Sequence, residues 1–200
     1  SAQDLRKNRK PDIGFESHPG DVLVEMSQKA HGPTGAWDEW FVELRERETA
    51  RNAEIVAEGE EHNGELVNPI QFFRRMDALM GDDAVLVVDG GDFVATGAYV
   101  LRPRGPLRWL DPGVFGTLGV GGGFTIGAQL VYPSSQVWII YGDGSSGYSL
   151  AEFDTYCRHG LAPIAVIGTD ASWGQIARDQ VTILGTALGT ELRRTDYHKV

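Results

Sequence analysis

The sequence contains a single cysteine, Cys157, and no apolar run long enough to cross a membrane. One cysteine excludes an internal disulfide, and a membrane-spanning helix needs about 20 consecutive, mostly apolar residues. The net charge of -10 argues against a nucleic-acid-binding surface. No secretory signal is visible at the start of the chain. We therefore expect a cytoplasmic protein that binds neither nucleic acid nor membrane.

Glycine, in contrast, is abundant, with 26 residues, which is well above its usual share of about 7%. The glycines gather in loops between apolar runs, as expected where backbone must approach a ligand closely. Hydrophobic and charged contents of 42% and 23% are typical of a globular protein. The chain starts without methionine and ends soon after T-D-Y-H-K, which reads as the start of a helix. We therefore expect a fragment of a longer polypeptide.

Residues 1–64 read as two helices with polar segments around them. Asp21 is expected to cap a short helix that extends to Ala30. Pro33-Thr34 is expected to open a long amphipathic helix, and residues 58–64 form a polar boundary after it. We expect this helix to pack on a domain surface through apolar residues at helical spacing: Trp37, Trp40, Phe41, Leu44, Ala50 and Ala53.

From Asn68 onward, short apolar runs alternate with amphipathic segments. Asn68 and Pro69 are expected to cap a helix whose apolar side includes Phe73 and Leu79. Strands are expected at residues 84–88, 107–110, 136–141 and 163–168, and further helices at 119–131, 149–159 and 173–181. This alternation predicts an α/β fold in which helices cover both faces of a parallel sheet.

Two acidic loops are the strongest functional signal, because each follows an apolar run that reads as a buried strand. Asp143 stands between Gly142 and Gly144, and Asp170 stands 27 positions later. This spacing leaves room for a helix between two strands, so we expect both carboxylates at the strand ends where open α/β sheets bind ligands. Glycine turns and helix N-termini bind phosphate, and Mg²⁺ prefers oxygen ligands. The pattern predicts a divalent-cation and diphosphate site, with two ordinary turn aspartates as the alternative.

The two loops together resemble the thiamine-diphosphate motif, in which G-D-G is followed one strand–helix–strand unit later by N-N. Here Thr169 and Asp170 take the two asparagine positions. Exchange of Asn for Asp keeps an oxygen ligand and adds negative charge. The resemblance implies that Mg²⁺ is bound by the side chains of Asp143 and Asp170 and by the backbone carbonyl of Ser172.

Two further segments resemble the same family. The stretch G-T-L-G-V-G-G-G-F-T-I-G-A, at residues 116–128, resembles the segment that holds the aminopyrimidine ring, in which Leu118 wedges between the two cofactor rings and forces a bend. The stretch D-G-G-D-F, at residues 89–93, resembles the loop that touches the diphosphate. The resemblance implies these cofactor contacts: Asp92, Phe93, Gly116, Leu118, Gly142, Asp143, Gly144, Ser145, Asp170, Ser172 and Trp173.

Within this family, the chain most resembles the 2-hydroxyacyl-CoA lyases, including their acetolactate-synthase-like branch. The stretches that carry this resemblance are Y-G-D-G-S-S-G-Y-S-L-A-E-F-D-T-Y-C-R-H-G, D-A-S-W-G-Q-I-A-R-D-Q-V and T-D-Y-H-K. It implies that residues 65–200 are the pyrophosphate-binding domain, truncated at its C-terminus. Residues 1–64 would then be the end of the middle domain and a helical linker.

The resemblance also implies an activity. Such a lyase uses thiamine diphosphate and Mg²⁺ to cleave 2-hydroxyacyl-CoA into formyl-CoA and an aldehyde or ketone, and it also catalyses the reverse, acyloin-type condensation. The glutamate that activates the cofactor belongs to the pyrimidine-binding domain of a neighbouring subunit. We therefore expect a homodimer or homotetramer with shared active sites, and a segment that is inactive by itself.

Several residues are candidates for substrate contacts. In the family, the helix that opens at Trp173 faces the cofactor, so Gln175 is a candidate to bind the thioester or hydroxyl, with Ile176 beside it. Glu191 is a candidate acid–base group, with a surface charge as the alternative. Three arginines are candidates to bind CoA phosphates, with a solvated loop as the alternative: Arg102, Arg104 and Arg108.

Two other functions stay open. An acetolactate synthase or an oxalyl-CoA decarboxylase-like enzyme would share the cofactor residues with the lyase. A non-catalytic nucleotide- or phosphate-binding regulator is the alternative from another class. Magnesium-dependent binding of thiamine diphosphate separates that regulator from both enzymes.

Overall fold

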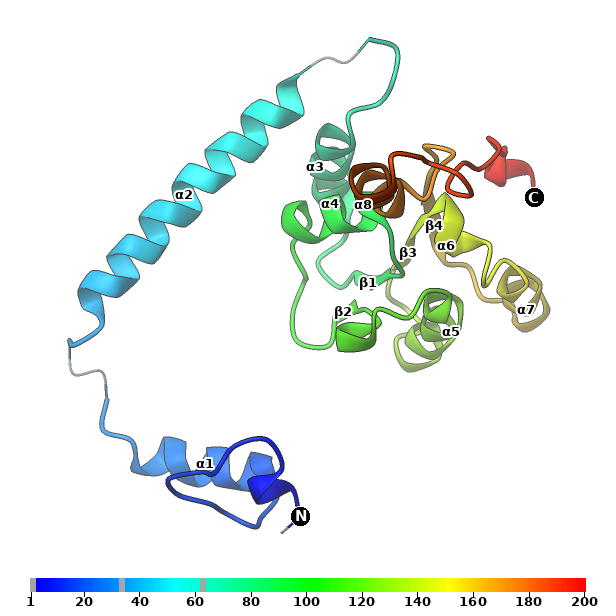
Figure 1. The fold of residues 1–200 in the computed structure, drawn as a ribbon. Helices are drawn as coiled ribbons and strands as arrows, with labels where there is room; N and C mark the ends of the chain where they lie inside the picture. Colours follow the sequence, from blue (N-terminus) through cyan, green and yellow to red (C-terminus); the bar gives the residue numbers. More distant parts are fainter. Residues whose placement is uncertain (1–2, 33–34, 62–63) are drawn as a thin grey trace. The chain divides into compact units, whose positions relative to one another are not determined.

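The computed structural model describes residues 3–32, 35–61 and 64–200 (Figure 1). The chain forms two compact units, residues 1–52 and residues 53–200. The first unit contains a short 3-10 helix (Asp4–Arg6), helix α1 (Pro19–Lys29) and most of helix α2 (Asp38–Glu60). The second unit contains the end of α2 and the whole α/β part of the chain.

Both helices of the first unit differ from expectation. Helix α1 begins at Pro19, two residues before the expected cap at Asp21, because the fixed φ of proline suits the first helical position. The expected opening of the long helix at Pro33-Thr34 lies outside the described residues. Trp37 and Trp40 are exposed, so the expected packing of this face is not confirmed.

The last turns of α2 join the second unit through Asn68. Ile55 is buried there, and a Cβ added at Gly59 would lie 2.9 Å from Ile70 Cγ2. Asn68 Oδ1 accepts the N–H of Ile70 at 2.9 Å, which confirms the expected cap of α3 (Pro69–Leu79). Asn68 Nδ2 donates to the carbonyl of Glu58 at 2.8 Å. One side chain therefore ties the end of α2 to the start of α3.

The sheet has four parallel strands in the order β2-β1-β3-β4. These are β1 (Val85–Val88), β2 (Trp109–Leu110), β3 (Val137–Gly142) and β4 (Ile164–Gly168). The register pairs Val88 with Ile140 and Gly142 with Gly168. The predicted parallel sheet is confirmed, and the carboxyl ends of β1, β3 and β4 meet at one edge.

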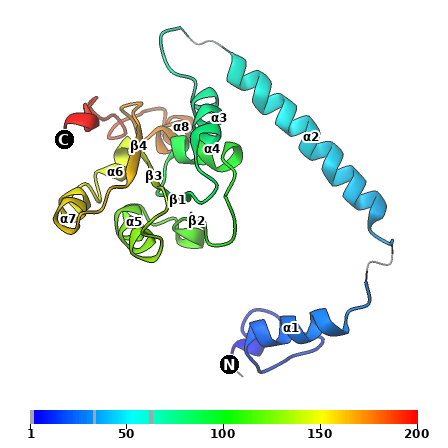
Figure 2. The same cartoon turned by 180° about the vertical axis from the view of Figure 1, so that it is seen from behind.

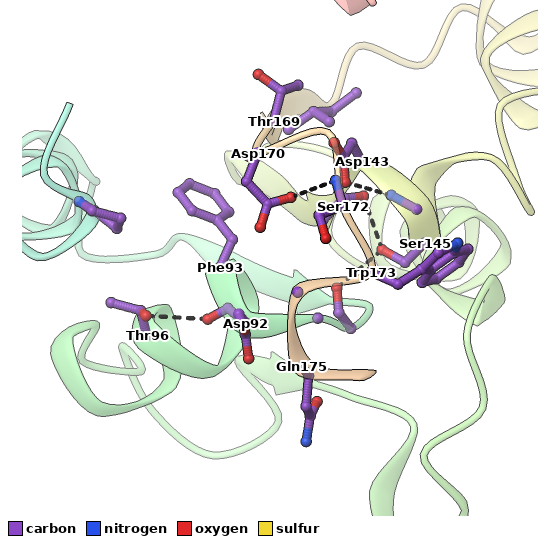
Figure 3. A pocket seen from close by; sticks show the side chains of 18 of the residues that line it. Asp92, Phe93, Thr96, Asp143, Ser145, Thr169, Asp170, Ser172, Trp173 and Gln175 are labelled. Carbon is purple, nitrogen blue, oxygen red and sulfur yellow. Dashed lines mark hydrogen bonds between the residues drawn. The ribbon is translucent and has the colours of Figure 1, made fainter. Parts of the chain in front are cut away.

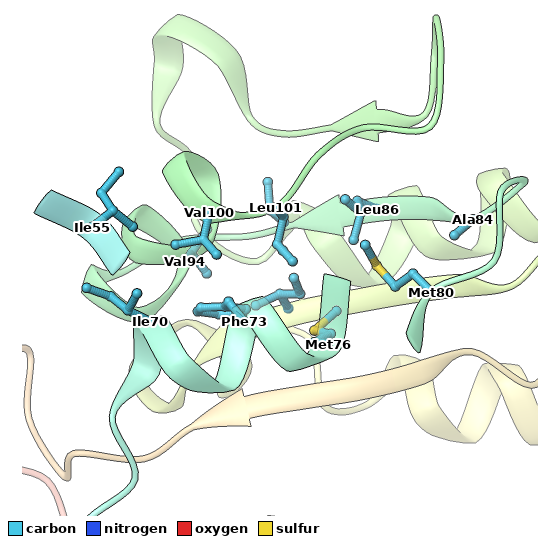
Figure 4. Close-up of a cluster of buried hydrophobic side chains, with 12 residues drawn as sticks. Ile55, Ile70, Phe73, Met76, Met80, Ala84, Leu86, Val94, Val100 and Leu101 are labelled. Atoms are coloured by element: carbon cyan, nitrogen blue, oxygen red, sulfur yellow. The ribbon is translucent and has the colours of Figure 1, made fainter. Parts of the chain in front are cut away.

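Side chains alternate between the two faces of the sheet, as the period of a strand requires. Leu86 and Ile140 pack with Phe73 of α3 and with α4 (Asp92–Val100) (Figure 4). Val87 and Ile139 pack on the other side with α5 (Val120–Val131) and α7 (Glu152–His159). Both views show α3 and α4 on one side of the sheet and α5 and α7 on the other (Figures 1 and 2). The expected helices on both faces are confirmed.

Several element bounds differ from the sequence-based expectations. The second strand is shorter than residues 107–110, and α7 begins at Glu152 after the short helix α6 (Asp143–Ser146). Helix α8 runs from Gly174 to Leu184, and T-D-Y-H-K leads into a 3-10 turn, Tyr197–Lys199. Another 3-10 turn spans Gly113–Phe115. Helix α4 was not predicted.

In the described parts of the chain, no helix is long and apolar enough to span a membrane.

Phe73 is expected to be a major contributor to the stability of this fold. Its side chain is fully buried between Phe72, Phe93 and Gly97, so Phe73→Ala should lower the free energy of unfolding by about 3–5 kcal/mol. Leu79 on the same helix is 76% exposed, contrary to its expected place in the apolar face, so Leu79→Ala should cost less than about 0.5 kcal/mol. Urea unfolding followed by circular dichroism measures both, and equal losses would contradict the assigned core.

Candidate functional site

A cavity of about 650 Å³ lies at the carboxyl ends of β1, β3 and β4 (Figure 3). The loops after these three strands line it, together with Leu118 and the segment that precedes α3. Most of the residues singled out from the sequence meet here: Asp92, Phe93, Leu118, Gly142, Asp143, Gly144, Ser145, Asp170, Ser172, Trp173, Gln175 and Ile176. The two acidic loops, remote in sequence, therefore share one cavity.

Asp143 joins the two acidic loops. Its side chain is buried, and Oδ1 accepts the N–H of Gly144 while Oδ2 accepts the N–H of Ala171, each at 2.8 Å. Burial raises the pKa of Asp143, and the nearby charge of Asp170 raises it further. A carboxylate oxygen has two lone pairs, so each oxygen can still bind a cation while it accepts its amide.

The loop that carries Asp170 is held in a strained conformation. Ala171 has a φ of +60°, which is uncommon for a residue with a Cβ. Residues with such strained backbone are found most often at functional sites. Asp170 Oδ1 accepts the N–H of Ser172 at 3.0 Å, and Trp173 N–H donates to the carbonyl of Thr190 at 2.8 Å. These bonds keep the loop at the mouth of the cavity, with the Asp170 carboxylate near Asp143.

Glycines allow close contacts around the cavity. A Cβ added at Gly144 would lie 2.6 Å from the ring of Trp173, so this ring packs directly on the G-D-G loop. A Cβ added at Gly174 would lie 2.9 Å from Asp170 Oδ2 and 3.0 Å from Asp92 Oδ2. Backbone therefore approaches the cavity where side chains do not fit, as a phosphate-binding loop requires.

The N-termini of α4 and α8 both face the cavity, and an ion pair joins them. Arg178 of α8 binds both carboxylate oxygens of Asp92, with 2.7 Å between Nη2 and Oδ1. The Asp92 carboxylate raises the pKa of Arg178. Because Arg178 pairs with Asp92, the repulsion between that carboxylate and an anion bound at the N–H groups of the first turn of α4 is reduced.

Leu118 also lines the cavity. A Cβ added at Gly90 would lie 2.2 Å from Leu118 Cδ2, so the side chain rests on the backbone of the loop after β1. Gly116 has a left-handed φ of 56° and does not line the cavity, so its predicted contact with the pyrimidine stays a prediction.

The three arginines of the 102–108 segment lie elsewhere. Arg104 forms an ion pair with Asp77 at 3.1 Å. The guanidinium of Arg108 lies 4.0 Å from the centre of the Tyr132 ring and donates to the carbonyl of Asp83, two residues before β1. None of the three lines the cavity, so their predicted role at CoA phosphates gains no support from their positions. Glu191 is exposed and pairs through its backbone with Ser172, also outside the cavity lining.

Other lining residues were not singled out from the sequence. Leu66, Val67 and Phe72 form an apolar wall, and Arg194 lines the cavity and donates to the carbonyl of Thr169 at 3.4 Å. Asp89 does not line the cavity, but its side chain accepts the N–H of Gly119, the residue after Leu118. Asp89 stands in the quoted D-G-G-D-F stretch, which is a usable signal, but no pattern in the sequence marks the apolar wall.

The donor set fits a divalent cation that also binds a ligand. Within the described residues, no three His, Cys, Asp or Glu side chains form a group that could hold a metal ion. Asp143 and Asp170 supply hard oxygen donors, which Mg²⁺ prefers. Mg²⁺ usually binds one or two carboxylates together with substrate phosphates. The cavity therefore suits a magnesium–diphosphate pair better than a metal ion bound by protein alone.

Comparison with known proteins identifies the family. Residues 89–200 match the family described as "Thiamine pyrophosphate enzyme, C-terminal TPP binding domain". The chain belongs to this family, which confirms the resemblance drawn from the G-D-G motif. Thiamine diphosphate is therefore the cofactor of this domain, with Mg²⁺ as its usual partner metal.

Individual relatives agree with this assignment. The chain is 47% identical to 2-hydroxyacyl-CoA lyase 2 of Danio rerio, over 96% of this chain and 31% of that protein. It is 34% identical to a probable acetolactate synthase of Mycobacterium bovis, over 90% of this chain and 33% of that protein. The chain thus spans about a third of the length of these curated relatives.

A solved structure shows the same fold. It is the thiamine diphosphate-dependent 4-hydroxybenzoylformate decarboxylase of Rhodococcus jostii RHA1. The TM-score is 0.63 at 22% identity, and the match covers 70% of this chain and 26% of the decarboxylase. At this identity the likeness extends to the fold alone.

Gly174→Ala should weaken magnesium-dependent binding of thiamine diphosphate by about 10- to 100-fold, the usual cost of disturbing groups around a metal. The added Cβ would force Asp170 and Asp92 apart. Gly32→Ala is the matched control, because its added Cβ meets nothing within 4 Å. Calorimetry on the full-length polypeptide measures both affinities, and an unchanged affinity in Gly174→Ala would count against Asp170 as a ligand.

Proposed function

We propose that this chain forms the diphosphate-binding half of the active site in a thiamine-diphosphate- and Mg²⁺-dependent lyase. The enzyme cleaves 2-hydroxyacyl-CoA to formyl-CoA and an aldehyde or ketone, and it also catalyses the reverse condensation. The observation that carries this proposal is the difference in identity between relatives. Identity is 47% to a protein named 2-hydroxyacyl-CoA lyase 2 and 34% to one named acetolactate synthase, each over nearly the whole chain.

The residues at the strand ends hold the cofactor. Asp143, Asp170 and the carbonyl of Ser172 bind Mg²⁺, and the N–H groups at the start of α4 and in the G-D-G loop bind the diphosphate. Ser145 keeps that loop in place, since its hydroxyl lies 3.0 Å from the carbonyl of Gly90 and 3.1 Å from that of Gly142. Bound thiamine diphosphate supplies the nucleophilic carbon and the electron sink for cleavage of a carbon–carbon bond.

The rest of the cavity offers one apolar side and one polar side to the substrate. Leu66, Phe72 and Ile176 line the apolar side, and we assign the hydrocarbon part of the substrate to it, because apolar surface excludes water. Gln175 is the polar residue at the start of α8 and contacts the thioester or hydroxyl. Glu191 stays a candidate acid–base group from the sequence, and its exposed position outside the cavity lining adds no support for that role.

The site is completed by parts outside this chain. The glutamate that activates the cofactor comes from the pyrimidine-binding domain of a second subunit, in a homodimer or homotetramer. This segment alone should therefore bind the magnesium–diphosphate end of the cofactor without turnover. A cytoplasmic location stays a prediction from the cysteine content.

Substitution of Asp143 tests the cofactor site. Asp143→Ala removes a metal ligand, so we expect the affinity for thiamine diphosphate to fall by more than about 100-fold, above the usual effect of outer residues around a metal. Asp143→Asn removes the negative charge but keeps one oxygen that can accept the Ala171 N–H, while its NH₂ group then faces the Gly144 N–H. Asp83→Ala is the control, because Asp83 precedes β1 and lies at the amino-terminal end of that strand, away from the cavity. Calorimetry with and without EDTA measures the affinity, and cofactor retained in both Asp143 variants would overturn the metal assignment.

Product analysis separates the candidate enzymes. The full-length protein is supplied with 2-hydroxyacyl-CoA or with pyruvate, and formyl-CoA and acetolactate are quantified. Formyl-CoA from the first substrate supports the lyase. Acetolactate from pyruvate without formyl-CoA would favour the acetolactate synthase that the 34% identical relative represents. An absence of magnesium-dependent cofactor binding would leave the non-catalytic regulator as the better explanation.

A further inference from the structure

Asp89 is a buried carboxylate to which the proposed function gives no role. It follows β1 directly, and its side chain is 2% exposed. Oδ1 accepts the N–H of Gly119 at 2.9 Å, and Oδ2 accepts the N–H of Gly121 at 2.7 Å. Burial raises the pKa of Asp89, while these two N–H groups and the hydroxyl of Ser145 act in the opposite direction. A buried charge needs such partners, so the carboxylate and the two amides depend on one another.

The two amides belong to the N-terminus of α5, where backbone N–H groups lack partners within the helix. Gly119 is the N-cap residue, and as a glycine it has no side chain with which to cap. Its φ of +89° and the 2.5 Å distance from an added Cβ to Tyr148 Cβ exclude larger residues. Asp89 therefore caps α5 from 30 positions earlier in the chain and holds the peptide that joins Leu118 to Gly119.

Leu118 is held a second time through its side chain. Gly90, the residue after Asp89, lies so close that an added Cβ would be 2.2 Å from Leu118 Cδ2. The side chain of Asp89 thus fixes the backbone next to Leu118, and Gly90 leaves the space that the Leu118 side chain occupies. Both contacts come from one loop, and Leu118 lines the cavity while Asp89 does not.

The structure assigns Asp89 as a positioning residue that sets how far Leu118 enters the cavity. This inference rests on the proposed function, in which Leu118 contacts the cofactor rings. Asp89 is not a catalytic residue, because its oxygens face the amides of Gly119 and Gly121 and the hydroxyl of Ser145, and it does not line the cavity. Its effect on the cofactor passes through the Leu118–Gly119 peptide.

The test uses Asp89→Asn in the full-length protein. Asparagine keeps the size and one acceptor oxygen but turns an NH₂ group toward one of the two amides, so Leu118 should shift. We expect deuterium exchange at C2 of bound thiamine diphosphate, measured per bound cofactor by quench and NMR, to slow about tenfold, as small misplacements do. In the apoprotein, amide exchange at Gly119 and Gly121 should accelerate. Should Asp89→Asn fail to fold, Asp89→Ser, with one uncharged acceptor, takes its place.

Asp111→Asn is the matched control. Asp111 also accepts a glycine amide, that of Gly113 at 2.6 Å, and it is exposed seven positions before Leu118. Its C2 exchange should equal that of the unmodified protein. Leu118→Ala should slow exchange, and the double variant with Asp89→Asn should be no slower than Leu118→Ala alone, because residues that act through one another are not additive.

Each other outcome overturns the assignment in its own way. A lower melting temperature with unchanged C2 exchange per bound cofactor would show a purely structural role for Asp89. Multiplicative effects of Asp89→Asn and Leu118→Ala would show that the two residues act separately. Unchanged exchange in Leu118→Ala would overturn the proposed contact of Leu118 with the cofactor, and the assignment of Asp89 with it. Loss of exchange in Leu118→Ala but not in Asp89→Asn would overturn the assignment of Asp89 alone.

Discussion

The parallel pairing of β3 with β4 is the constraint on which the site depends. Because Gly142 pairs with Gly168, both strands end at one level, and the loops with Asp143 and Asp170 leave the sheet side by side. A Cβ added at Gly168 would lie 2.2 Å from Phe93 Cγ, so the first turn of α4, directly after the loop that follows β1, packs on this same edge. Three loops thus meet around one volume, and a shift in register by one residue would separate them.

The sheet and the acidic loops could be predicted because their signals are local. Val85–Val88 is an unbroken apolar strand, and the G-D-G loop stands directly after another. Helix α4 could not be predicted in this way, because Gly97 and several β-branched residues lower its helix propensity. Tertiary packing holds it instead, since Phe73 lies where a side chain at residue 97 would stand.

The positions of the site motifs could be predicted from the sequence, but the contacts between their side chains could not. Motif positions such as Asp143 and Asp170 meet in one cavity, but side-chain pairs that span long stretches of sequence have no local signature. The ion pair between Asp92 and Arg178 joins residues 86 positions apart. Arg108 shows the converse case, because it was a candidate for CoA phosphates with a solvated loop as the alternative, whereas it contacts the Tyr132 ring and the carbonyl of Asp83 just before β1. Charge and composition indicate that an arginine needs a partner, and only the fold decides which.

The hydrogen bonds of Asn68 bear on the residue at which the independently folding domain begins. Its side chain bonds the carbonyl of Glu58 and the first amides of α3, and Ile55 belongs to the core cluster around Phe73. The contacts that stabilise the domain therefore extend across the change in composition near residue 64. A polypeptide cut there would expose the apolar surface that Ile55 covers and remove acceptors of the Asn68 amide. An autonomous version of this domain should begin within α2, near the point at which the compact unit starts.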